Sequence, residues 1–472
     1  MSSIPHPSSD PHRIRLSRSI RWGYGGGEWA NAVVWTAFTS LFVYFMTDTV
    51  HMSAAFAGTV VLVGTLWNTV LQPFVGMISD RTTSRMGRRR PFLIFSLAPY
   101  MIASWLLFTD IGATDTAGAL YYAAVVVVWF TSLSAFYVPY SAMGAELTAD
   151  YDERTSLSTV RTVFSQLGAL LGATLPLALL EPLTSMTGSA DAAWSIAGAI
   201  LAAFAGAGIL VTWITSRAPT MAVSVPVSTR LRDAALLLRS RTFRLLMGAY
   251  VFGWAPLSLI GTIAVFYAVH IMDYTESDAS VVLLAWFAAG LAWLPLVGIL
   301  SRRIGKVATY LVFTISWAIV QVLFLIPSQG DDVVFWVALL GSSAGSMAVA
   351  VTGWSLLADV TDVEQLRSGR RQEGAMYGMA ALAQTGFAAV VVWAAGIILS
   401  ASGYTGEGAP SENSLLAIRL LLSIGPGLCL IPGILFASRI RLTRGRHDRI
   451  RAALEGPGPL TDGERRTLLE GL

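Results

Sequence analysis

The chain has 472 residues, of which 54% are hydrophobic and 13% are charged, whereas roughly 25% of the residues in an ordinary soluble domain are charged. A soluble chain of this length would need the charged surfaces of several domains, because a single water-soluble core stops growing at roughly 250–300 residues. The composition therefore excludes a soluble enzyme, a disordered protein and a disulfide scaffold, and the net charge of +3 does not alter that choice.

Twelve apolar runs follow one another along the chain. Each is long enough to cross a bilayer as a helix, which takes about 20 residues. We therefore expect an all-α integral membrane protein with twelve transmembrane helices in two pseudo-symmetric six-helix bundles. The runs are 24–47, 54–78, 91–109, 119–147, 158–181, 193–215, 244–269, 279–300, 307–326, 333–357, 374–400 and 415–438.

The basic residues divide the connecting segments into two sets. Of the 32 lysines and arginines, 30 lie in the two tails and in every second loop, and only Arg161 and Arg419 lie inside apolar runs. Segments rich in Lys and Arg stay on the cytoplasmic side of a membrane. We predict a multi-pass protein of the cytoplasmic membrane with both termini in the cytoplasm.

The longest polar interruption splits the runs into six plus six. The predicted segments are a cytoplasmic N-tail at 1–21, an N-terminal bundle at 22–215, a cytoplasmic linker at 216–243, a C-terminal bundle at 244–438 and a cytoplasmic C-tail at 439–472. Apolar residues at helical spacing in the linker predict a short amphipathic helix on the membrane surface, namely Leu231, Ala234, Ala235 and Leu238.

The sequence has few cysteine and histidine residues that could act as nucleophiles or bind a metal ion. Cys429 is the only cysteine, and the five histidines have no ligand spacing, so the sequence predicts no metal site and no cofactor. No nucleophile–base pair is evident, which argues against an enzyme. The basic residues lie in short loops, which argues against binding of nucleic acid. We expect a monomer whose partners are a small-molecule solute and membrane lipids.

Four sequence blocks carry a resemblance that covers nearly the whole chain. The first is 24–28 with Asn31. The second includes Thr47-Asp48, 79–81 and 87–91. The third is 139–154, and the fourth is 358–362 with Glu364, Gly369, Arg371, Glu373 and Gly374. Together they resemble the glycoside-pentoside-hexuronide:cation symporters of the major facilitator superfamily, the family of the melibiose permease. The resemblance implies two halves that rock about a cavity near the bilayer midplane.

Charged residues inside the apolar runs are candidates for the transport pathway, because a charge at mid-bilayer costs on the order of 2.5–3.5 kcal/mol. Arg161 matches the arginine of span five that the resemblance places beside the substrate cavity, although it could instead snorkel to the inner surface. Glu28 lies near the start of span one and is the candidate coupling group, although it could also be interfacial.

Aromatic rings stack on the C–H faces of sugars, but Trp and Tyr also anchor helices at the membrane interfaces. The predicted substrate-binding set combines such rings with two polar residues, and comprises Arg161, Tyr137, Tyr140, Trp29, Asn31 and Trp354.

Acids and arginines also gather at the inner ends of several spans. They could pair across the two halves when the inner side is shut, or simply satisfy topology at the surface, where an exposed ion pair is worth under roughly 1 kcal/mol. The predicted cytoplasmic gate comprises Asp80, Arg81, Glu146, Arg154, Asp359, Arg371 and Glu373.

The sequence departs from the family at the cation site. The two acids that cation-coupled members carry in span two fall on Asn68 and Gln72, and the lysine of span eleven falls on Thr385. Loss of one charge alone would leave the other buried and unpaired, so the joint neutrality suggests a retired ion site. Sodium coupling is therefore not expected, and a proton acting through Glu28 is the remaining candidate coupling ion.

The sequence predicts a secondary active or facilitative transporter that moves a small organic solute by alternating access. A glycoside or sugar is the leading class, because the family transports such solutes. A lipid-like or amphipathic solute is the alternative, since the acids that the family resemblance places near the sugar in spans one and four fall on Ala32 and Tyr137. A membrane sensor that binds ligand without transport is a third interpretation.

Overall fold

The computed structural model describes residues 16–148, 150–216, 237–369, 372–455 and 462–470. The amphipathic helix predicted around Leu231 and most of the N-tail lie outside these residues. The first group of helices is α1 (Arg18–Tyr44), which continues into the π-helix η1 (Phe45–Thr49), then α2 (Ala54–Arg81), α3 (Arg90–Leu106), α4 (Thr116–Leu147), α5 (Tyr151–Thr187) and α6 (Ala190–Thr215). The second group is α8 (Arg241–His270), α9 (Glu276–Ile304), α10 (Lys306–Val322) with the 3₁₀-helix η2 (Leu323–Leu325), α11 (Asp332–Ser368), α12 (Glu373–Ala401) and α13 (Glu412–Ala437), followed by α14 (Arg444–Glu455) and α15 (Asp462–Leu469).

Eleven helices of the described chain are long and apolar enough to cross a membrane. The twelfth expected span is α3, whose 17 residues rise only about 25 Å at 1.5 Å per residue. Most helices extend beyond the predicted apolar runs, because polar residues continue the backbone hydrogen bonding past the apolar core. The expected all-helical membrane fold is thus confirmed, with one span shorter than the rest.

Serine and threonine caps set where many of these helices begin. The side chains of Ser17, Ser53, Ser189, Ser240 and Ser411 each accept a backbone N–H of the first turn. At the start of α9, the side chain of Thr275 and that of Asp278 form a reciprocal capping box. Such caps satisfy N–H groups that the helix itself leaves without partners, so loop residues fix the starts of several apolar helices.

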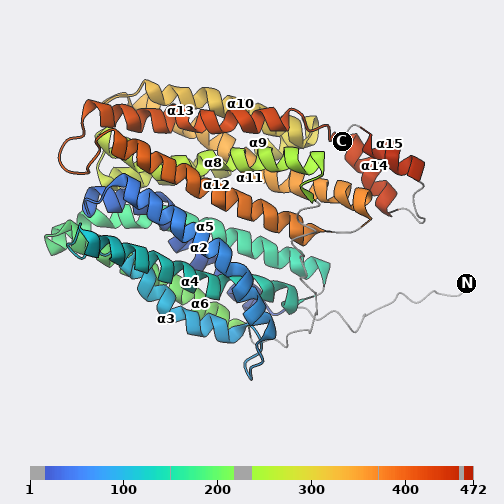
Figure 1. The fold of residues 1–472 in the computed structure, drawn as a ribbon, viewed down its shortest axis with the longest axis horizontal. Coiled ribbons are helices and arrows are strands. Elements are labelled where there is room, and N and C mark those ends of the chain that lie inside the picture. Colours follow the sequence, from blue (N-terminus) through green and yellow to red (C-terminus); the bar gives the residue numbers. More distant parts are fainter. Residues whose placement is uncertain (1–15, 149, 217–236, 370–371, 456–461, 471–472) are drawn as a thin grey trace, which may run out of the picture.

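The helices form two groups that lie one above the other in Figure 1, with α8–α13 in the upper group and α1–α6 in the lower. Within the first group α1 packs on α5 and α6, and within the second α8 packs on α13 and α12. Three pairs join the groups: α2 with α12, α5 with α9, and α1 with α8. The space between the two groups is therefore bordered chiefly by α1, α2, α5, α8, α9 and α12.

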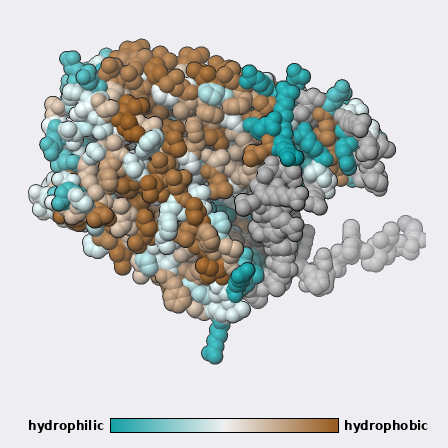
Figure 2. Space-filling model, viewed as in Figure 1, coloured by the Kyte–Doolittle hydropathy of each residue, from teal (hydrophilic) through white to brown (hydrophobic). Residues whose placement is uncertain are grey.

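Large apolar side chains cover much of the exterior. Figure 2 shows them across the middle of the molecule, with hydrophilic residues gathered towards the two ends. Phe95 on α3, for example, is 74% exposed and Val333 on α11 is 77% exposed. Exposure of this extent is a liability in water but suits contact with lipid tails.

Candidate functional site

A cavity of about 230 Å³ lies between the two helix groups. Its lining comes from both groups, so neither forms it alone. From α1 and α2 it is lined by Trp35, Thr36, Phe38, Thr39, Ser40, Val43, Val61 and Thr65. From α8, α9 and α12 it is lined by Trp254, Leu257, Ser258, Gly261, Leu283, Trp286, Phe287, Gln384, Thr385, Ala388, Ala389 and Val392.

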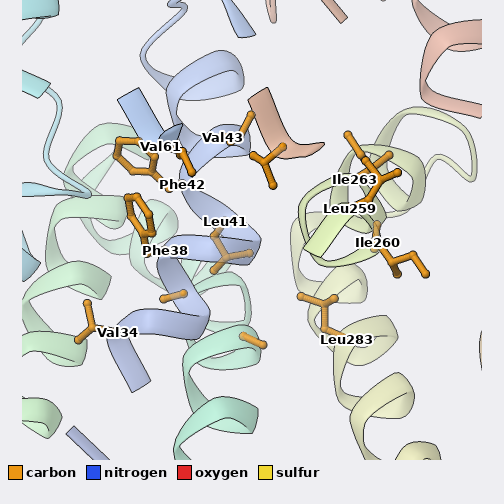
Figure 3. Packing of buried hydrophobic residues seen from close by; sticks show 14 of the residues in the cluster. Val34, Phe38, Leu41, Phe42, Val43, Val61, Leu259, Ile260, Ile263 and Leu283 are labelled. Atoms are coloured by element: carbon orange, nitrogen blue, oxygen red, sulfur yellow. The ribbon is translucent and has the colours of Figure 1, made fainter. Parts of the chain in front are cut away.

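Aromatic packing behind α1 holds the wall of the cavity on that side. Phe38 packs against Trp129 with ring centroids 4.7 Å apart, and Trp35 stacks on the same indole at 6.4 Å. Figure 3 shows Phe38, Val43 and Val61 on one side and Leu283 on the other. Because Trp129 is fully buried, the two cavity rings of α1 rest on a rigid support.

The polar part of the lining is neutral. It consists of hydroxyl groups and the Gln384 amide, and the described lining residues include no side chain with a formal charge. The Tyr250 hydroxyl donates a hydrogen bond to Gln384 Oε1 at 2.6 Å, and the Tyr250 ring contacts that of Trp254 at 6.0 Å. The amide that faces the cavity is therefore held by a tyrosine behind it.

Glu28 on α1 and Arg161 on α5 form an ion pair. The guanidinium donates from Nη2 and Nε to Glu28 Oε2, at 2.7 and 3.0 Å. The Tyr137 hydroxyl donates to the other carboxylate oxygen at 3.3 Å. The Arg161 guanidinium also lies over the rings of Tyr140 and Tyr24, at 5.5 and 6.0 Å. The sequence-predicted residues Arg161, Glu28, Tyr137 and Tyr140 thus lie together.

The glycine run before Glu28 makes this close arrangement possible. A Cβ on Gly27 would collide with the Tyr140 ring, and a Cβ on Gly26 would lie 2.6 Å from the Gly208 carbonyl oxygen on α6. Tyr140 donates its hydroxyl to the Tyr24 carbonyl at 2.9 Å. The first sequence block is therefore a packing surface that brings α4 and α6 against α1.

One face of α1 connects the ion pair with the cavity. Glu28, Asn31 and Trp35 recur at a spacing of three and four residues, which places them on the same side of a helix. Asn31 is half-buried and lies between the charged pair and the cavity ring. Seven residues separate Glu28 from Trp35, or about 10 Å along the axis.

The residues of the predicted retired ion site lie on the packed pair α2 and α12. Asn68 is buried, and its Oδ1 accepts a hydrogen bond from the Ser134 hydroxyl at 2.6 Å. Thr385 lines the cavity, whereas Gln72 is partly exposed one turn beyond Asn68. The structure thus places one of the three in the cavity and gives Asn68 a neutral partner.

Two predicted aromatic ligands lie elsewhere. Trp29 donates its indole N–H to the Phe204 carbonyl of α6 at 3.2 Å, so it serves the packing of α1 on α6. Trp354 is 40% exposed and stacks on Tyr377, with ring centroids 5.7 Å apart. Neither belongs to the cavity lining, and the other four residues of the predicted substrate-binding set also lie outside it: Arg161, Tyr137, Tyr140 and Asn31.

A three-residue cluster, here called the clamp, joins the two halves at the end of α1. Asp48 Oδ1 lies 2.7 Å from His270 Nε2 and accepts the Tyr404 hydroxyl at 2.6 Å. Tyr404 Oη and His270 Nε2 are 2.6 Å apart. Burial and the neighbouring Asp48 carboxylate raise the pKa of the Tyr404 hydroxyl well above its ordinary value, so this hydroxyl keeps its proton. The Tyr44 hydroxyl adds a bond to Glu276 at 3.0 Å.

Sequence reasoning missed the clamp. Asp48 belongs to the second sequence block but has no predicted role there, and no role is predicted for His270 or Tyr404 either. The three residues come from η1, the last turn of α8 and the loop after α12, and are 134 or more positions apart in sequence. The conspicuous position of an Asp and a His at the ends of two apolar runs was the only signal available.

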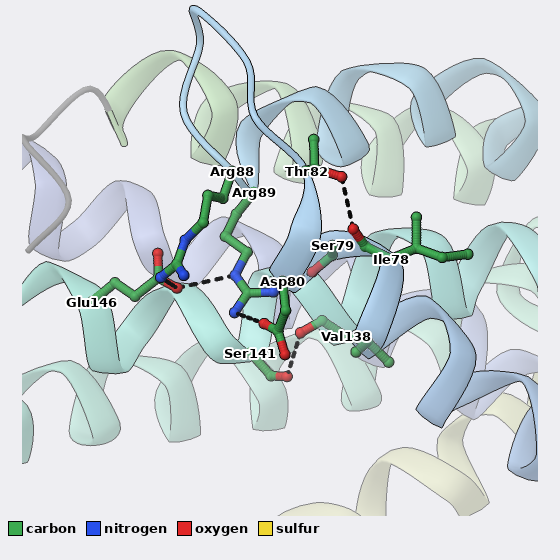
Figure 4. A network of polar contacts seen from close by, with 9 residues as sticks. All are labelled: Ile78, Ser79, Asp80, Thr82, Arg88, Arg89, Val138, Ser141 and Glu146. Atoms are coloured by element: carbon green, nitrogen blue, oxygen red, sulfur yellow. Dashed lines mark hydrogen bonds and ion pairs between the residues drawn. The ribbon is translucent and has the colours of Figure 1, made fainter. Parts of the chain in front are cut away.

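The predicted gate residues of the first half lie at the opposite end of the helices. Figure 4 shows Arg89 between Asp80 and Glu146. Arg89 contacts Asp80 Oδ1 at 2.5 Å and Glu146 Oε1 at 3.1 Å, and Arg88 contacts the same Glu146 oxygen at 2.8 Å. These pairs bind the ends of α2, α3 and α4 together within one half.

Two of the remaining gate residues, Asp359 and Arg154, are held in the same local way. Asp359 pairs with Lys306 at 2.6 Å and lies 3.7 Å from His447 of α14. Arg154 Nε donates to the Thr148 carbonyl at 3.0 Å. Arg81 is exposed and Glu373 opens α12, while Arg371 lies outside the described residues. Each of the ion pairs named here joins groups of one half, whereas the clamp joins both.

Two helix bundles that share a central cavity and are fastened to each other at one end define a secondary transporter of the major facilitator fold. The chain belongs to the family described as MFS/sugar transport protein, whose sequence profile matches residues 23–444. The family resemblance expected from the four blocks is thereby confirmed.

Individual relatives and structures agree with this assignment. A putative glycoside/cation symporter of Escherichia coli is 28% identical, with 90% of each chain covered. A glucuronide carrier protein homolog of Escherichia coli is 24% identical over 87% of this chain and 90% of its own. The crystal structure of a bacterial homolog of the human lysosomal transporter Spinster matches with a TM-score of 0.67 and 13% identity, covering 93% of this chain and 99% of its own, which shows the fold alone.

Proposed function

We propose that this protein moves a sugar or glycoside across the cytoplasmic membrane by alternating access. The observation that carries the proposal is the central cavity, because both halves line it and the clamp fastens them together at one end. Release of the clamp, together with closure at the Asp80 end, would expose the same cavity to the other side of the membrane.

The sidedness follows from charge. The two tails, the linker and the loops at the same end of the bundle as Asp80 carry 30 of the 32 lysines and arginines, so we place them in the cytoplasm. The clamp then faces the outside, and the structure corresponds to a state closed to the exterior. In this state the gate residues pair within their own halves, which leaves them available to pair across the halves when the inner side shuts.

We further propose that transport is not driven by sodium. Sodium prefers hard anionic oxygen ligands, and the positions that carry acids in cation-coupled relatives are Asn68 and Gln72. Glu28 remains as the candidate proton carrier. Its protonation would remove the charge that holds Arg161 and so free the guanidinium, which would link a proton to a change beside the pathway.

Counterflow in proteoliposomes tests the proposal. Labelled glycoside should exchange with unlabelled glycoside in the absence of any ion gradient. An imposed sodium gradient should leave uptake unchanged, and Glu28→Gln should abolish any stimulation by a pH gradient while equilibrium exchange persists. Strong stimulation by sodium would contradict the coupling proposal, and binding without exchange would favour a sensor.

An amphipathic solute is a second candidate, and the aromatic lining of the cavity favours it. Competition separates the two. A lysolipid that blocks the exchange of every glycoside and is itself exchanged would identify the lipid-like solute as the substrate.

A further inference from the structure

The described lining residues of the central cavity are all uncharged, whereas the neighbouring Glu28 and Arg161 are charged. Among the described residues, its polar lining consists of neutral groups, namely Thr36, Thr39, Ser40, Thr65, Ser258, Gln384 and Thr385. A carboxylate placed there would lose its water and gain no cation, and burial of an unpaired charge is among the costliest events in a protein. The lining therefore discriminates against an anionic solute.

The arginine beside the pathway does not change this conclusion. Arg161 donates two hydrogen bonds to Glu28, at 2.7 and 3.0 Å. Glu28 lies two turns of α1 before Trp35, about 10 Å away along the axis. Glu28 already neutralises this guanidinium, so an acidic sugar that reached Arg161 would have to compete with the Glu28 carboxylate for one cation.

Gln384 gives the cavity a directed hydrogen-bond donor. The Tyr250 hydroxyl donates to Gln384 Oε1 at 2.6 Å, which occupies the carbonyl side of the amide. The amide nitrogen Nε2 remains to donate to a solute, and it carries two N–H groups. A solute that meets this wall must therefore present oxygen acceptors such as sugar hydroxyls.

The apolar part of the cavity lining comes from five aromatic rings, those of Trp35, Phe38, Trp254, Trp286 and Phe287. Rings in this number can cover an apolar group as well as the C–H face of a sugar. We infer that the solute is an uncharged glycoside with an apolar aglycone, that Gln384 binds its sugar hydroxyls, and that sugar acids are excluded. This inference rests on the proposed function, and it names the class of substrate for the same site.

The test uses matched probes with the wild-type protein. Counterflow is measured for the phenyl β-glycosides of glucose, galactose and xylose, for the methyl β-glycosides of the same sugars, and for phenyl β-glucuronide. We expect the best neutral phenyl glycoside to exchange at least about tenfold faster than the glucuronide, the scale of discrimination expected for an unpaired buried group. It should also bind more tightly than its methyl counterpart.

The outcomes distinguish failure of this inference from failure of the proposed function. A glucuronide that exchanges as fast as the neutral glycosides would overturn this inference and leave the proposed function standing. No exchange of any glycoside, neutral or acidic, with exchange of a lysolipid in its place, would overturn the proposed function itself.

Variants test the role of Gln384. Gln384→Glu replaces the donor by an acceptor and should slow exchange of the preferred phenyl glycoside at least about tenfold. Tyr250→Phe removes the group that positions the amide, and should raise the KM for exchange more than it lowers the maximal rate. Asn413→Asp makes the same amide-to-acid change at the exposed start of α13 and is the control. Gel filtration and thermal unfolding confirm folding, and a well-folded Gln384→Glu with wild-type exchange would overturn the assignment.

Discussion

The pair of Glu28 and Arg161 shows how a single charge becomes tolerable within an apolar bundle. Their side chains are 10% and 30% exposed, and the glycines of α1 bring Tyr140 and Tyr24 against the guanidinium. A carboxylate, a hydroxyl donor and two ring faces together replace much of the water that the ions lose. The pair is therefore compatible with the membrane although neither member would be alone.

Removal of one partner should accordingly cost more than removal of both. Arg161→Gln should lower the thermal stability of the detergent-solubilised protein, because Glu28 is left buried without a cation. The double variant Glu28→Gln with Arg161→Gln should lose less than the sum of the single changes, with a coupling energy of about 2 kcal/mol. Additive effects in thermal unfolding would mean that the pair contributes nothing as a unit.

Restoration of the acids at the retired ion site gives a second residue-scale prediction. Asn68 is 4% exposed and is bonded to Ser134. Asn68→Asp combined with Gln72→Asp should therefore reduce the folded fraction extracted from membranes, since buried unpaired charges cost several kcal/mol. Addition of Thr385→Lys should recover part of it. Asn413→Asp at the exposed start of α13 is the matched control, and a normal yield of the double acid variant would contradict the argument.

At the scale of elements, the end of α1 carries the clamp, which we propose holds the present conformation. The helix does not stop at Tyr44 but widens into the π-turn Phe45–Thr49, a departure that is frequent at functional sites. Asp48 lies in that turn and reaches both α8 and the loop after α12. Gly406 has φ of +74°, which lets this loop pass close to Thr47.

Loss of the clamp should shift the protein towards a state open at this end. Asp48→Asn weakens two hydrogen bonds to a charged acceptor, worth about 1.5–3 kcal/mol each, so the outward-open population should rise at least about tenfold. The measurement is labelling of Ser40→Cys, in a Cys429→Ser background, by a membrane-impermeant thiol reagent applied from outside. Asp110→Asn in a loop between α3 and α4 of a single half is the control. Equal labelling of the introduced cysteine in the background protein, in its Asp48→Asn variant and in its Asp110→Asn variant would refute the role of the clamp.

The elements themselves were predictable from sequence, but the contacts between them were only partly so. Apolar runs of about 20 residues and serine caps define helices locally, which is why the twelve expected runs correspond to helices and the difference lies in the length of α3. Arg161 and Glu28 were identifiable because a charge in an apolar run is costly. The clamp was not, because Asp48, His270 and Tyr404 are ordinary loop and helix-end residues until folding brings them together.

At the scale of the whole molecule, the two ends of the bundle differ in chemistry. The Asp80 end carries arginines in pairs that stay within each half, and the clamp end is joined across the halves through an acid, an imidazole and a phenol. Rocking of the two halves requires that the contacts between them at one end break while contacts at the other end form. We propose that the acids and bases that are now paired locally at the Asp80 end supply the groups for that second closure.

We expect the distribution of basic residues to orient the molecule in the membrane, and this expectation gives the final prediction. Thirty of the 32 basic residues fall in the two tails and the loops on one side, and such loops resist translocation. A reporter that is active only in the cytoplasm should therefore be active when fused after Leu472 and inactive when fused near Ser185, in the last turn of α5. A reporter active only outside should give the reverse pattern at both positions. Activity of the cytoplasmic reporter at Ser185, or its silence at Leu472, would invert the membrane orientation and place the clamp on the cytoplasmic side.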